Sequence, residues 1–227
     1  MNVKALFFNE LWLALSENID ILVLRNYEGF PQNLGNDVDL LVMDSSILSV
    51  LEICENISLN SRFKIVKKIE RNNNLMAVYF SNRSNSLDIL KVDFFTELSK
   101  GWLSYASTKY VLNNKIKYGM YFVPDLTHEA YLLLMKELFM YGRLRSRYVV
   151  RFASKYKDIN FEEIYNISDG LVAKPSILKI VTHYSDIGNI VLTPRPTIKN
   201  VMQLTTAISW LYYTIKYRFF KLLFFKK

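Results

Sequence analysis

Cysteine, glycine, proline and histidine are all scarce in this chain of 227 residues. The single cysteine, Cys54, excludes a disulfide framework and is typical of a reducing compartment. Only 7 residues are glycine, about 3% against a usual ~7%, and neither Gly-x-Gly-x-x-Gly nor Gly-x-x-x-x-Gly-Lys-Ser/Thr occurs. The two histidines form no His-Glu-x-x-His motif, which excludes a zinc protease of that type. Glycine-rich nucleotide loops and this zinc motif are therefore absent.

Hydrophobic and aromatic residues are plentiful by comparison. They make up 51% and 15% of the chain, enough for a substantial core, and this excludes a wholly disordered protein. The length fits one domain, or one domain with a small appendage. The net charge is +8, and Asn, Ile and Tyr are abundant. Codon bias also produces a composition of this kind, so the charge by itself does not indicate a function. No recognition-helix motif accompanies this charge, so the sequence does not indicate a nucleic-acid partner.

The C-terminal segment is basic and aromatic. Between Ile198 and Lys227 there is no acidic residue, and aromatic side chains alternate with lysine and arginine. The uncharged run 200–215 has 16 residues, fewer than the ~20 that cross a bilayer. This pattern predicts an amphipathic helix that either lies on an anionic membrane surface or packs on the domain. The acidic residues Glu10 and Glu17 exclude a secretory leader, so we expect a cytoplasmic protein, peripheral at the inner face of the plasma membrane.

Apolar spacing divides the chain into two halves. Up to Pro124 it predicts a mixed sheet with flanking helices, of the α/β (α+β) class, and beyond Pro124 it predicts helices. We expect helices at 3–16, about 46–56 and from 126, strands at 19–25, 37–43, 63–69, 75–80, 87–95 and 118–123, and an irregular stretch at 101–114. The domains predicted are an α/β domain at 1–124, a helical region at 125–196 packed on it, and the C-terminal helix at 197–227.

A pair of carboxylates opens the second predicted strand. Asp37 and Asp39 belong to the sequence Gly-Asn-Asp-Val-Asp and lie two residues apart, on one face of a strand, with Cα atoms roughly 6–7 Å apart. Such neighbours repel unless a cation lies between them, which favours Mg²⁺ or Mn²⁺. A third carboxylate would complete a two-metal site: Asp93 is the candidate and Asp88, at a strand entrance, is its rival. Asp-x-Asp after Gly-Asn is also ordinary turn chemistry at the start of a strand.

A strand followed by Gly-x-Asp-x-Asp and by a later lone Asp in an apolar strand resembles the nucleotidyltransferase superfamily of the DNA polymerase beta type. Several sequence segments are similar to those of nucleotidyltransferase-like proteins encoded among bacterial surface-polysaccharide genes. The resemblance covers about residues 19–148. The segments that carry it are Leu-Val-Leu-Arg-Asn-Tyr-Glu-Gly at 22–29, Asp-Val-Asp-Leu-Leu-Val at 37–42, Val-Asp-Phe-Phe-Thr at 92–96, and Pro124 with His-Glu-Ala at 128–130.

The resemblance implies transfer of a nucleoside monophosphate from a nucleoside triphosphate (NTP) to a sugar or sugar-phosphate acceptor in surface-polysaccharide biosynthesis. Asp37 and Asp39 would hold both metal ions. Asp93 would hold one ion and help to deprotonate the acceptor. Mg²⁺ or Mn²⁺ is the implied cofactor.

The chain departs from the superfamily at the end of the first strand, where a Gly-Ser pair usually binds the triphosphate through backbone N–H groups. Here Arg25 and Asn26 take that place. We expect Arg25, Asn26 and Gly35 to bind phosphate, with the Arg25 guanidinium as a fork of donors. The same substitution also fits a chain that binds no triphosphate.

Basic residues follow the long helix predicted from residue 126. Lys136, Arg143 and Arg147 are spaced seven and four residues apart and would share a helix face. They are expected to clamp a triphosphate or an anionic acceptor; a solvated helix end is the alternative.

Two other functions stay open. The missing Gly-Ser pair suits a catalytically silent nucleotidyltransferase-like binding module. Alternatively, Asp37-Val38-Asp39 is the metal motif of a nucleotide-sugar-dependent glycosyltransferase. In that class the acidic triplet normally ends an apolar strand, whereas here the apolar run follows the triplet, which favours the nucleotidyltransferase.

Overall fold

The structure is a computed structural model of the chain, and the described residues are 3–35, 37–71, 74–100, 103–141, 145, 148, 150, 151, 154–156, 159, 163, 166 and 167. The chain forms two compact units. The first unit comprises Met1–Leu98 and Thr108–Asp125, and the second comprises Ser99–Ser107 and Leu126–Lys227. Each unit is described by itself.

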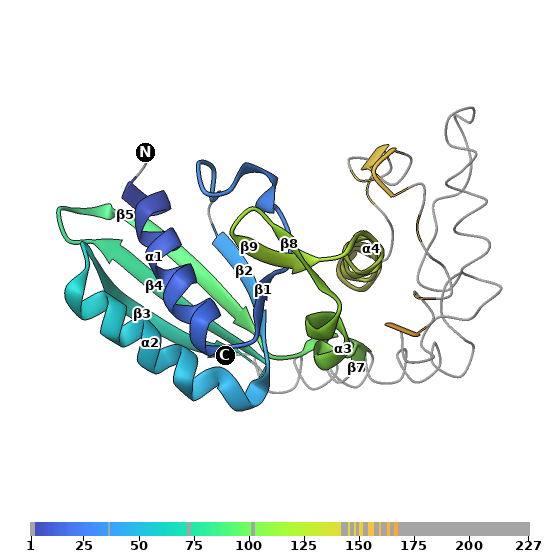
Figure 1. Ribbon diagram of the computed structural model, residues 1–227, viewed down its shortest axis with the longest axis horizontal. Coiled ribbons are helices and arrows are strands. Elements are labelled where there is room, and N and C mark those ends of the chain that lie inside the picture. Colours follow the sequence, from blue (N-terminus) through green and yellow to red (C-terminus); the bar gives the residue numbers. More distant parts are fainter. Residues whose placement is uncertain are drawn as a thin grey trace, which may run out of the picture. The chain divides into compact units, whose positions relative to one another are not determined.

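A five-stranded mixed sheet is the centre of the first unit (Figure 1). Its central pair, β2 and β5, is parallel, and every other neighbouring pair is antiparallel. The predicted fold class, a mixed sheet with flanking helices, is confirmed. In spatial order the strands are β1 (Ile21–Val23), β2 (Asp37–Val42), β5 (Asn85–Phe95), β4 (Leu75–Asn82) and β3 (Phe63–Arg71).

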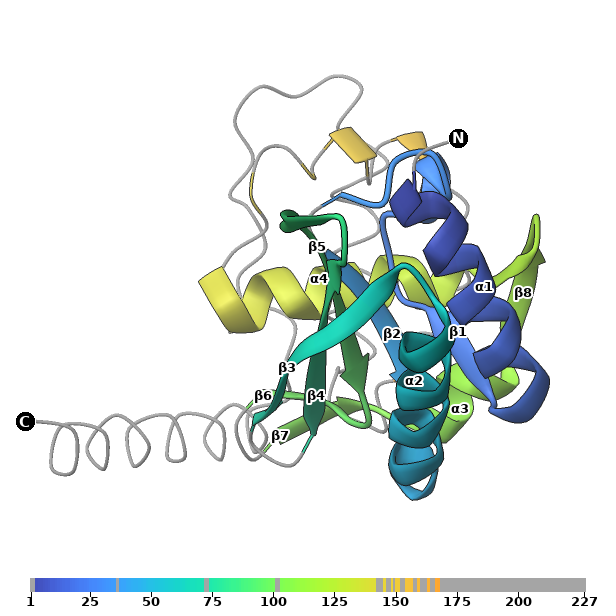
Figure 2. The same cartoon turned by 90° about the vertical axis from the view of Figure 1, so that its left-hand side faces the viewer.

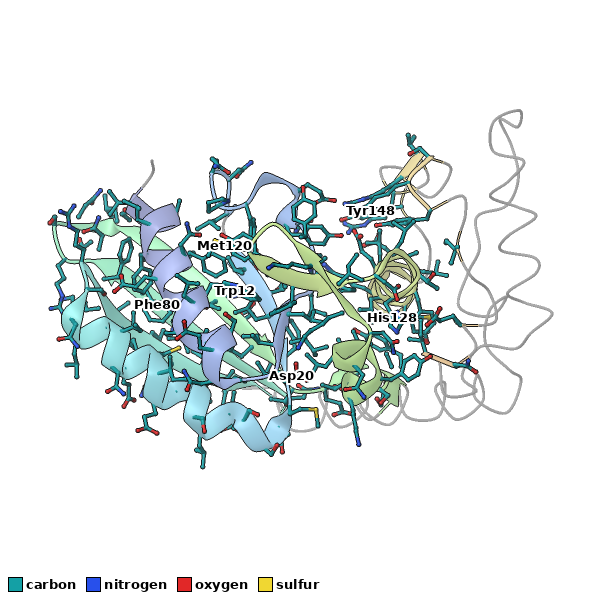
Figure 3. All side chains as sticks on the ribbon, viewed as in Figure 1. Trp12, Asp20, Phe80, Met120, His128 and Tyr148 are labelled. Carbon is teal, nitrogen blue, oxygen red and sulfur yellow. The ribbon has the colours of Figure 1, made fainter. Side chains whose placement is uncertain are left out.

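Two helices, α1 (Val3–Asn18) and α2 (Ile47–Asn60), cover one face of this sheet (Figures 1 and 2). Apolar residues recur along α1 at helical spacing, so one stripe of the helix faces the strands. Side chains alternate between the two faces of a strand, so alternate residues of the strands pack toward the helices. The shared core includes Phe8, Trp12 and Leu15 of α1, Val50 and Cys54 of α2, and Val38, Leu40, Val78, Phe80, Val92 and Phe94 of the strands (Figure 3).

The predicted strand at 118–123 is wrong in detail, because a hairpin occupies this region. Its strands are β8 (Lys115–Tyr118) and β9 (Tyr121–Pro124), and the chain reverses at Gly119, whose φ is +60°. A positive φ suits glycine, which has no Cβ to clash. The Trp12 indole N–H donates to the Met120 carbonyl over 2.9 Å and fixes the turn against α1. β8 carries exposed lysines, so its sequence lacks the apolar run that marked β9.

The stretch at 101–114, expected to be irregular, contains regular elements. Helix α3 (Thr108–Asn113) belongs to the first unit, lies against β2 and buries Val111 and Leu112. The Thr108 hydroxyl donates to the Thr96 carbonyl over 3.0 Å at the start of this helix. Ahead of α3, β7 (Leu103–Ala106) pairs with β6 (Leu98–Lys100). These elements are too short to show a clear hydrophobic period.

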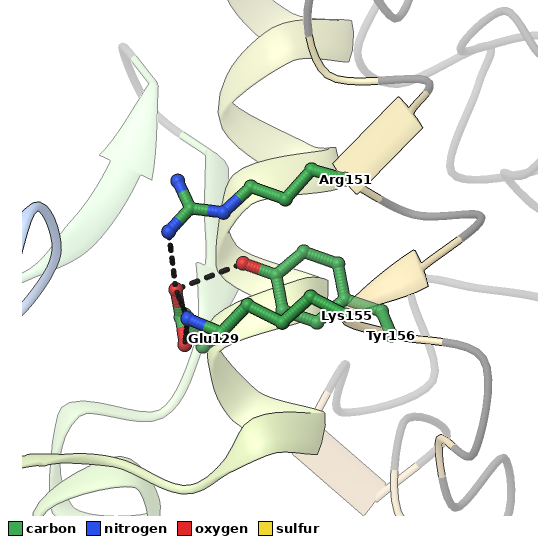
Figure 4. Close-up of polar contacts among 4 residues, drawn as sticks. All are labelled: Glu129, Arg151, Lys155 and Tyr156. Carbon is green, nitrogen blue, oxygen red and sulfur yellow. Dashed lines mark hydrogen bonds and ion pairs between the residues drawn. The ribbon is translucent and has the colours of Figure 1, made fainter. Parts of the chain in front are cut away.

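In the second unit, helix α4 (Leu126–Tyr141) begins where Pro124 and Asp125 predicted. Its buried Glu129 accepts hydrogen bonds from Lys155 Nζ at 2.8 and 2.9 Å, the Tyr156 hydroxyl at 2.8 Å and Arg151 Nη2 at 3.4 Å (Figure 4). These contacts hold Arg151, Lys155 and Tyr156 against α4.

Most of the predicted regions 125–196 and 197–227 lie outside the described residues, so their extents stay predictions. Among the helices that the structure describes, none is long and apolar enough to cross a membrane.

Candidate functional site

Three carboxylates meet on the face of the sheet opposite α1 and α2. Asp37 and Asp39 come from β2, and Asp93 comes from the parallel neighbour β5, where Asp39 and Asp93 are register partners. A carboxylate oxygen of each residue lies within 4.8 Å of one from each of the other two. The structure therefore brings together the three residues that the sequence singled out.

Asp88, the rival third carboxylate, lies on the other face of β5. Its Oδ1 is 2.8 Å from Lys4 Nζ of α1, and Asn82 Nδ2 donates to its Oδ2 over 3.2 Å. Burial alone would raise the pKa of Asp88, but the hydrogen bonds from Lys4 and Asn82 outweigh it and lower that pKa. Asp88 is thus a structural ion-pair partner, separate from the carboxylates of Asp37, Asp39 and Asp93.

Two cations accompany the three carboxylates. Arg25, which follows β1, donates from Nε to Oδ2 of Asp39. Lys91 of β5 donates from Nζ to Oδ2 of Asp93, and the same Nζ lies 3.7 Å from Asp37 Oδ2. Sequence analysis missed Lys91, although its two-residue spacing from Asp93 places both side chains on one face of β5.

Burial separates the three carboxylates. The side chains of Asp39 and Asp93 are 4% and 7% exposed, whereas that of Asp37 is 49% exposed. Burial raises the pKa of Asp39; Arg25 opposes this rise, and the charges of Asp37 and Asp93 add to it. For Lys91, burial alone would lower the pKa, but the hydrogen bond and the charge of Asp93 outweigh it and raise that pKa.

The carboxylates fit a divalent cation. Oδ1 of Asp93 is buried and has no hydrogen-bond partner among the described residues. A buried unpaired carboxylate oxygen is costly unless a cation or a donor meets it. All three residues offer hard oxygen ligands, which Mg²⁺ and Mn²⁺ prefer. Of the three carboxylates, that of Asp37 is the one half exposed to solvent.

The loop between β1 and β2 places Arg25 beside Asp39. The Leu24 N–H donates to the Asp39 carbonyl over 2.9 Å, so the chain leaves the sheet one residue before Arg25. Asn26 has a φ of +60° and begins a sharp bend into the short 3₁₀ helix Tyr27–Gly29. Gly35, with a φ of +67°, returns the chain toward β2. In this arrangement the Arg25 guanidinium is engaged with Asp39.

The expected basic clamp is described only in part. Lys136 is half-buried on α4, in the second unit. Arg143 and Arg147 lie outside the described residues.

No family model and no curated protein matches this chain. Among solved structures, the chain is similar to JHP933 from Helicobacter pylori, with a TM-score of 0.47, 10% identity and coverage of 99% of this chain and 97% of the other. It is also similar to a candidate nucleotidyltransferase from H. pylori, with a TM-score of 0.43, 11% identity and coverage of 98% and 99%.

Proposed function

We propose that this protein is a divalent-metal-dependent nucleotidyltransferase, which transfers a nucleoside monophosphate from an NTP to a sugar or sugar-phosphate acceptor. One observation carries the proposal: Asp37, Asp39 and Asp93 converge from two parallel strands, and Asp93 Oδ1 is buried and unpaired among the described residues. The sequence resemblance adds the surface-polysaccharide setting to the proposal.

In this proposal Asp37, Asp39 and Asp93 hold Mg²⁺ or Mn²⁺ through their carboxylate oxygens. When bound, the metal would neutralise charge on the phosphoryl oxygens during transfer. Asp93 also accepts the proton of the attacking acceptor hydroxyl. The buried position of Asp39 and Asp93 excludes most water and strengthens their electrostatic interactions.

Arg25 and Lys91 both act as cations in the proposed reaction, and Arg25 also binds the nucleotide. Without nucleotide they balance part of the negative charge of the three carboxylates. With nucleotide, Arg25 exchanges Asp39 for phosphate oxygens, since a guanidinium binds phosphate as a bidentate fork. This exchange replaces the backbone N–H groups that a Gly-Ser pair would supply at the same place.

A second candidate is a catalytically silent nucleotide-binding module, and the pairing of Arg25 with Asp39 favours it. If Arg25 stays on Asp39, the guanidinium keeps this carboxylate from a metal ion. The glycosyltransferase alternative gains no support from β2, which begins at Asp37 and places its apolar residues after the acidic triplet.

Calorimetric titration with each NTP, with and without Mg²⁺, tests the proposal. Asp39→Asn removes a proposed ligand, and Asp88→Asn is the matched control, a carboxylate on the other face of the sheet. We expect Mg²⁺-dependent binding in the wild type and in Asp88→Asn, and its loss in Asp39→Asn. Incubation with α-labelled NTP and sugar acceptors then measures transfer. Mg²⁺-dependent binding without transfer to any acceptor supports the silent module, and no NTP binding at all refutes both.

A further inference from the structure

We propose that the acceptor is a phosphorylated sugar, held on a strip of the sheet formed by Lys91, Tyr79 and Lys67, which we call the acceptor strip. The inference rests on the proposed function and deepens it, because it selects an anionic sugar over a neutral one and assigns it a place beside Asp93.

The acceptor strip follows from strand register. Asp37 of β2 pairs with Lys91 of β5, Lys91 pairs with Tyr79 of β4, and Tyr79 pairs with Lys67 of β3. Directly paired residues point to the same side of a sheet. The strip therefore extends from the carboxylates across three strands, on the face opposite α1 and α2.

Tyr79 provides an apolar surface in the middle of the strip. Its ring is half-buried, and the next position on that face of β4 is Ala77, the register partner of Asp93. Ala77 is small and fully buried, whereas Tyr79 keeps part of its ring exposed. An aromatic ring with a hydroxyl handle suits a sugar ring, which has C–H groups on its faces and hydroxyls at its edge.

Tyr79 lies between two lysines in the strand order, Lys67 on β3 and Lys91 on β5. Lys67 Nζ lies over the Tyr79 ring, 5.9 Å from its centroid, and the Lys67 side chain is exposed. Lys91 lies one strand away on the other side, and the Cα atoms of the two lysines are about 9–10 Å apart at the usual strand spacing. Lys91 is engaged with Asp93 and Asp37, whereas Lys67 is the lysine of the strip that faces open solvent. A compact ammonium at that outer end suits a phosphate group.

The strip approaches the carboxylates from the side opposite Arg25. Arg25 follows β1, at one edge of the sheet, and Lys67 lies on β3, at the other edge. Triphosphate at Arg25 and acceptor on the strip would thus meet at the three aspartates. This arrangement suits in-line transfer, in which nucleophile and leaving group lie on opposite sides of phosphorus.

The step balances with a sugar hydroxyl as nucleophile. Its oxygen forms the new bond to the α-phosphorus of the NTP, the bond from that phosphorus to the pyrophosphate oxygen breaks, and pyrophosphate leaves. The hydroxyl proton passes to the Asp93 carboxylate. The sugar's own phosphate stays at Lys67 as an anchor and takes no part in the bond changes.

Binding of sugar phosphates to the full-length protein tests the inference without any turnover. Glucose 1-phosphate and glucose 6-phosphate are titrated, with glucose as the neutral control, and ligand-observed NMR registers weak binding. Lys67→Gln removes the outer cation. Lys68→Gln is its matched control, because the neighbouring Lys68 faces α2, where it pairs with Glu55. Tyr79→Ala removes the ring, and Tyr79→Phe keeps it.

We expect a sugar phosphate to bind, and glucose to bind at least tenfold more weakly. Lys67→Gln should weaken sugar-phosphate binding by about tenfold, as the loss of one charge-assisted contact does, and Tyr79→Ala should weaken it by a similar factor. Tyr79→Phe keeps the ring and should weaken binding less than Tyr79→Ala does, while Lys68→Gln matches the wild type. Equal binding of glucose, no binding of either sugar phosphate, or an effect of Tyr79→Ala on NTP instead of sugar phosphate overturns the inference. Sugar-phosphate binding without NTP binding would refute the proposed function alone.

Discussion

Asp39 and Asp93 are register partners on two parallel strands, and their buried carboxylates lie on one face of the sheet beside the half-exposed Asp37. Two buried like charges at such close range are unfavourable unless cations compensate them. Arg25 and Lys91 supply part of this compensation, yet Asp93 Oδ1 has no hydrogen-bond partner among the described residues. The negative charge of the three carboxylates is thus only partly compensated, and they can bind a divalent cation.

Lys91→Gln should strengthen divalent-metal binding in the absence of nucleotide. Lys91 Nζ contacts Asp93 and lies 3.7 Å from Asp37, so the change removes a competing positive charge. Because Lys91 keeps some solvent exposure, we expect a gain of about tenfold in Mn²⁺ affinity, or about 1.4 kcal/mol. Calorimetric titration with Mn²⁺ measures the gain. Lys68 pairs with Glu55 on the other face of the sheet, so the control Lys68→Gln should leave the Mn²⁺ affinity unchanged. Weaker binding in Lys91→Gln would contradict the assignment of these carboxylates to a metal.

The raised pKa of Asp39 predicts a pH dependence of stability. Burial raises that pKa above its ordinary value of 3.8, so the folded protein binds this proton more tightly than the unfolded chain. The stability from protonated Asp39 is complete below about pH 3.8 and is lost as the pH rises through the folded pKa. Asp39→Asn removes this loss, so the variant should gain stability relative to the wild type as the pH rises above 3.8. Urea unfolding in EDTA at several pH values measures the difference, and a constant difference would count against the buried charge.

Alternation along β2 made the paired carboxylates predictable. A strand that begins at Asp37 and buries Val38, Leu40 and Val42 must place Asp37 and Asp39 on the other face, and the sequence alone shows this. The sequence also distinguishes Asp93 from Asp88. The two residues are five positions apart on one strand, so alternation places their side chains on opposite faces of the sheet.

Other features depend on contacts between distant segments. The pairing of Arg25 with Asp39 requires the bend at Asn26, and no local pattern specifies which side chain that bend would bring to Arg25. The hairpin of β8 and β9 was missed because β8 lacks an apolar run and because its turn is fixed by Trp12, 108 residues earlier in the chain. The acceptor strip from Lys91 to Lys67 requires the order of three strands, β5, β4 and β3, which the sequence left undetermined.

Cys54 should resist alkylation in the folded protein. Its thiol is buried in the core, and burial raises its pKa to about 12, so at pH 8 only about one thiol in ten thousand is the reactive thiolate. We expect iodoacetamide to leave native protein unmodified at pH 8, by mass spectrometry, and to modify it fully in 6 M guanidinium chloride. Rapid modification of the native protein would show that this part of the core opens readily.

Glu129→Gln should destabilise the second unit. The buried Glu129 carboxylate accepts hydrogen bonds from Lys155 and Tyr156, and neutralising it removes the counter-charge that Glu129 gives the Lys155 ammonium. Breaking a wholly buried pair costs about 3–5 kcal/mol, but Lys155 is partly exposed, so we expect about 2 kcal/mol. Thermal unfolding measures the effect, with the exposed Glu52→Gln as control. Equal melting temperatures for the two variants would show that this ion pair contributes little.

The segment from Ile198 to Lys227 should bind anionic membranes, a prediction that rests on its sequence alone. Each lysine or arginine near an anionic surface contributes about 1 kcal/mol, so replacing Lys216, Arg218 and Lys221 with Gln should weaken binding by roughly a hundredfold. Co-sedimentation with vesicles containing phosphatidylserine measures this, and vesicles of phosphatidylcholine alone are the neutral control. The aromatic residues remain in the triple variant, so a deletion of 198–227 separates their contribution from that of charge. If the variant that lacks residues 198–227 co-sediments as the full chain does, the segment is not the membrane contact. Packing on the domain then explains its amphipathic pattern better.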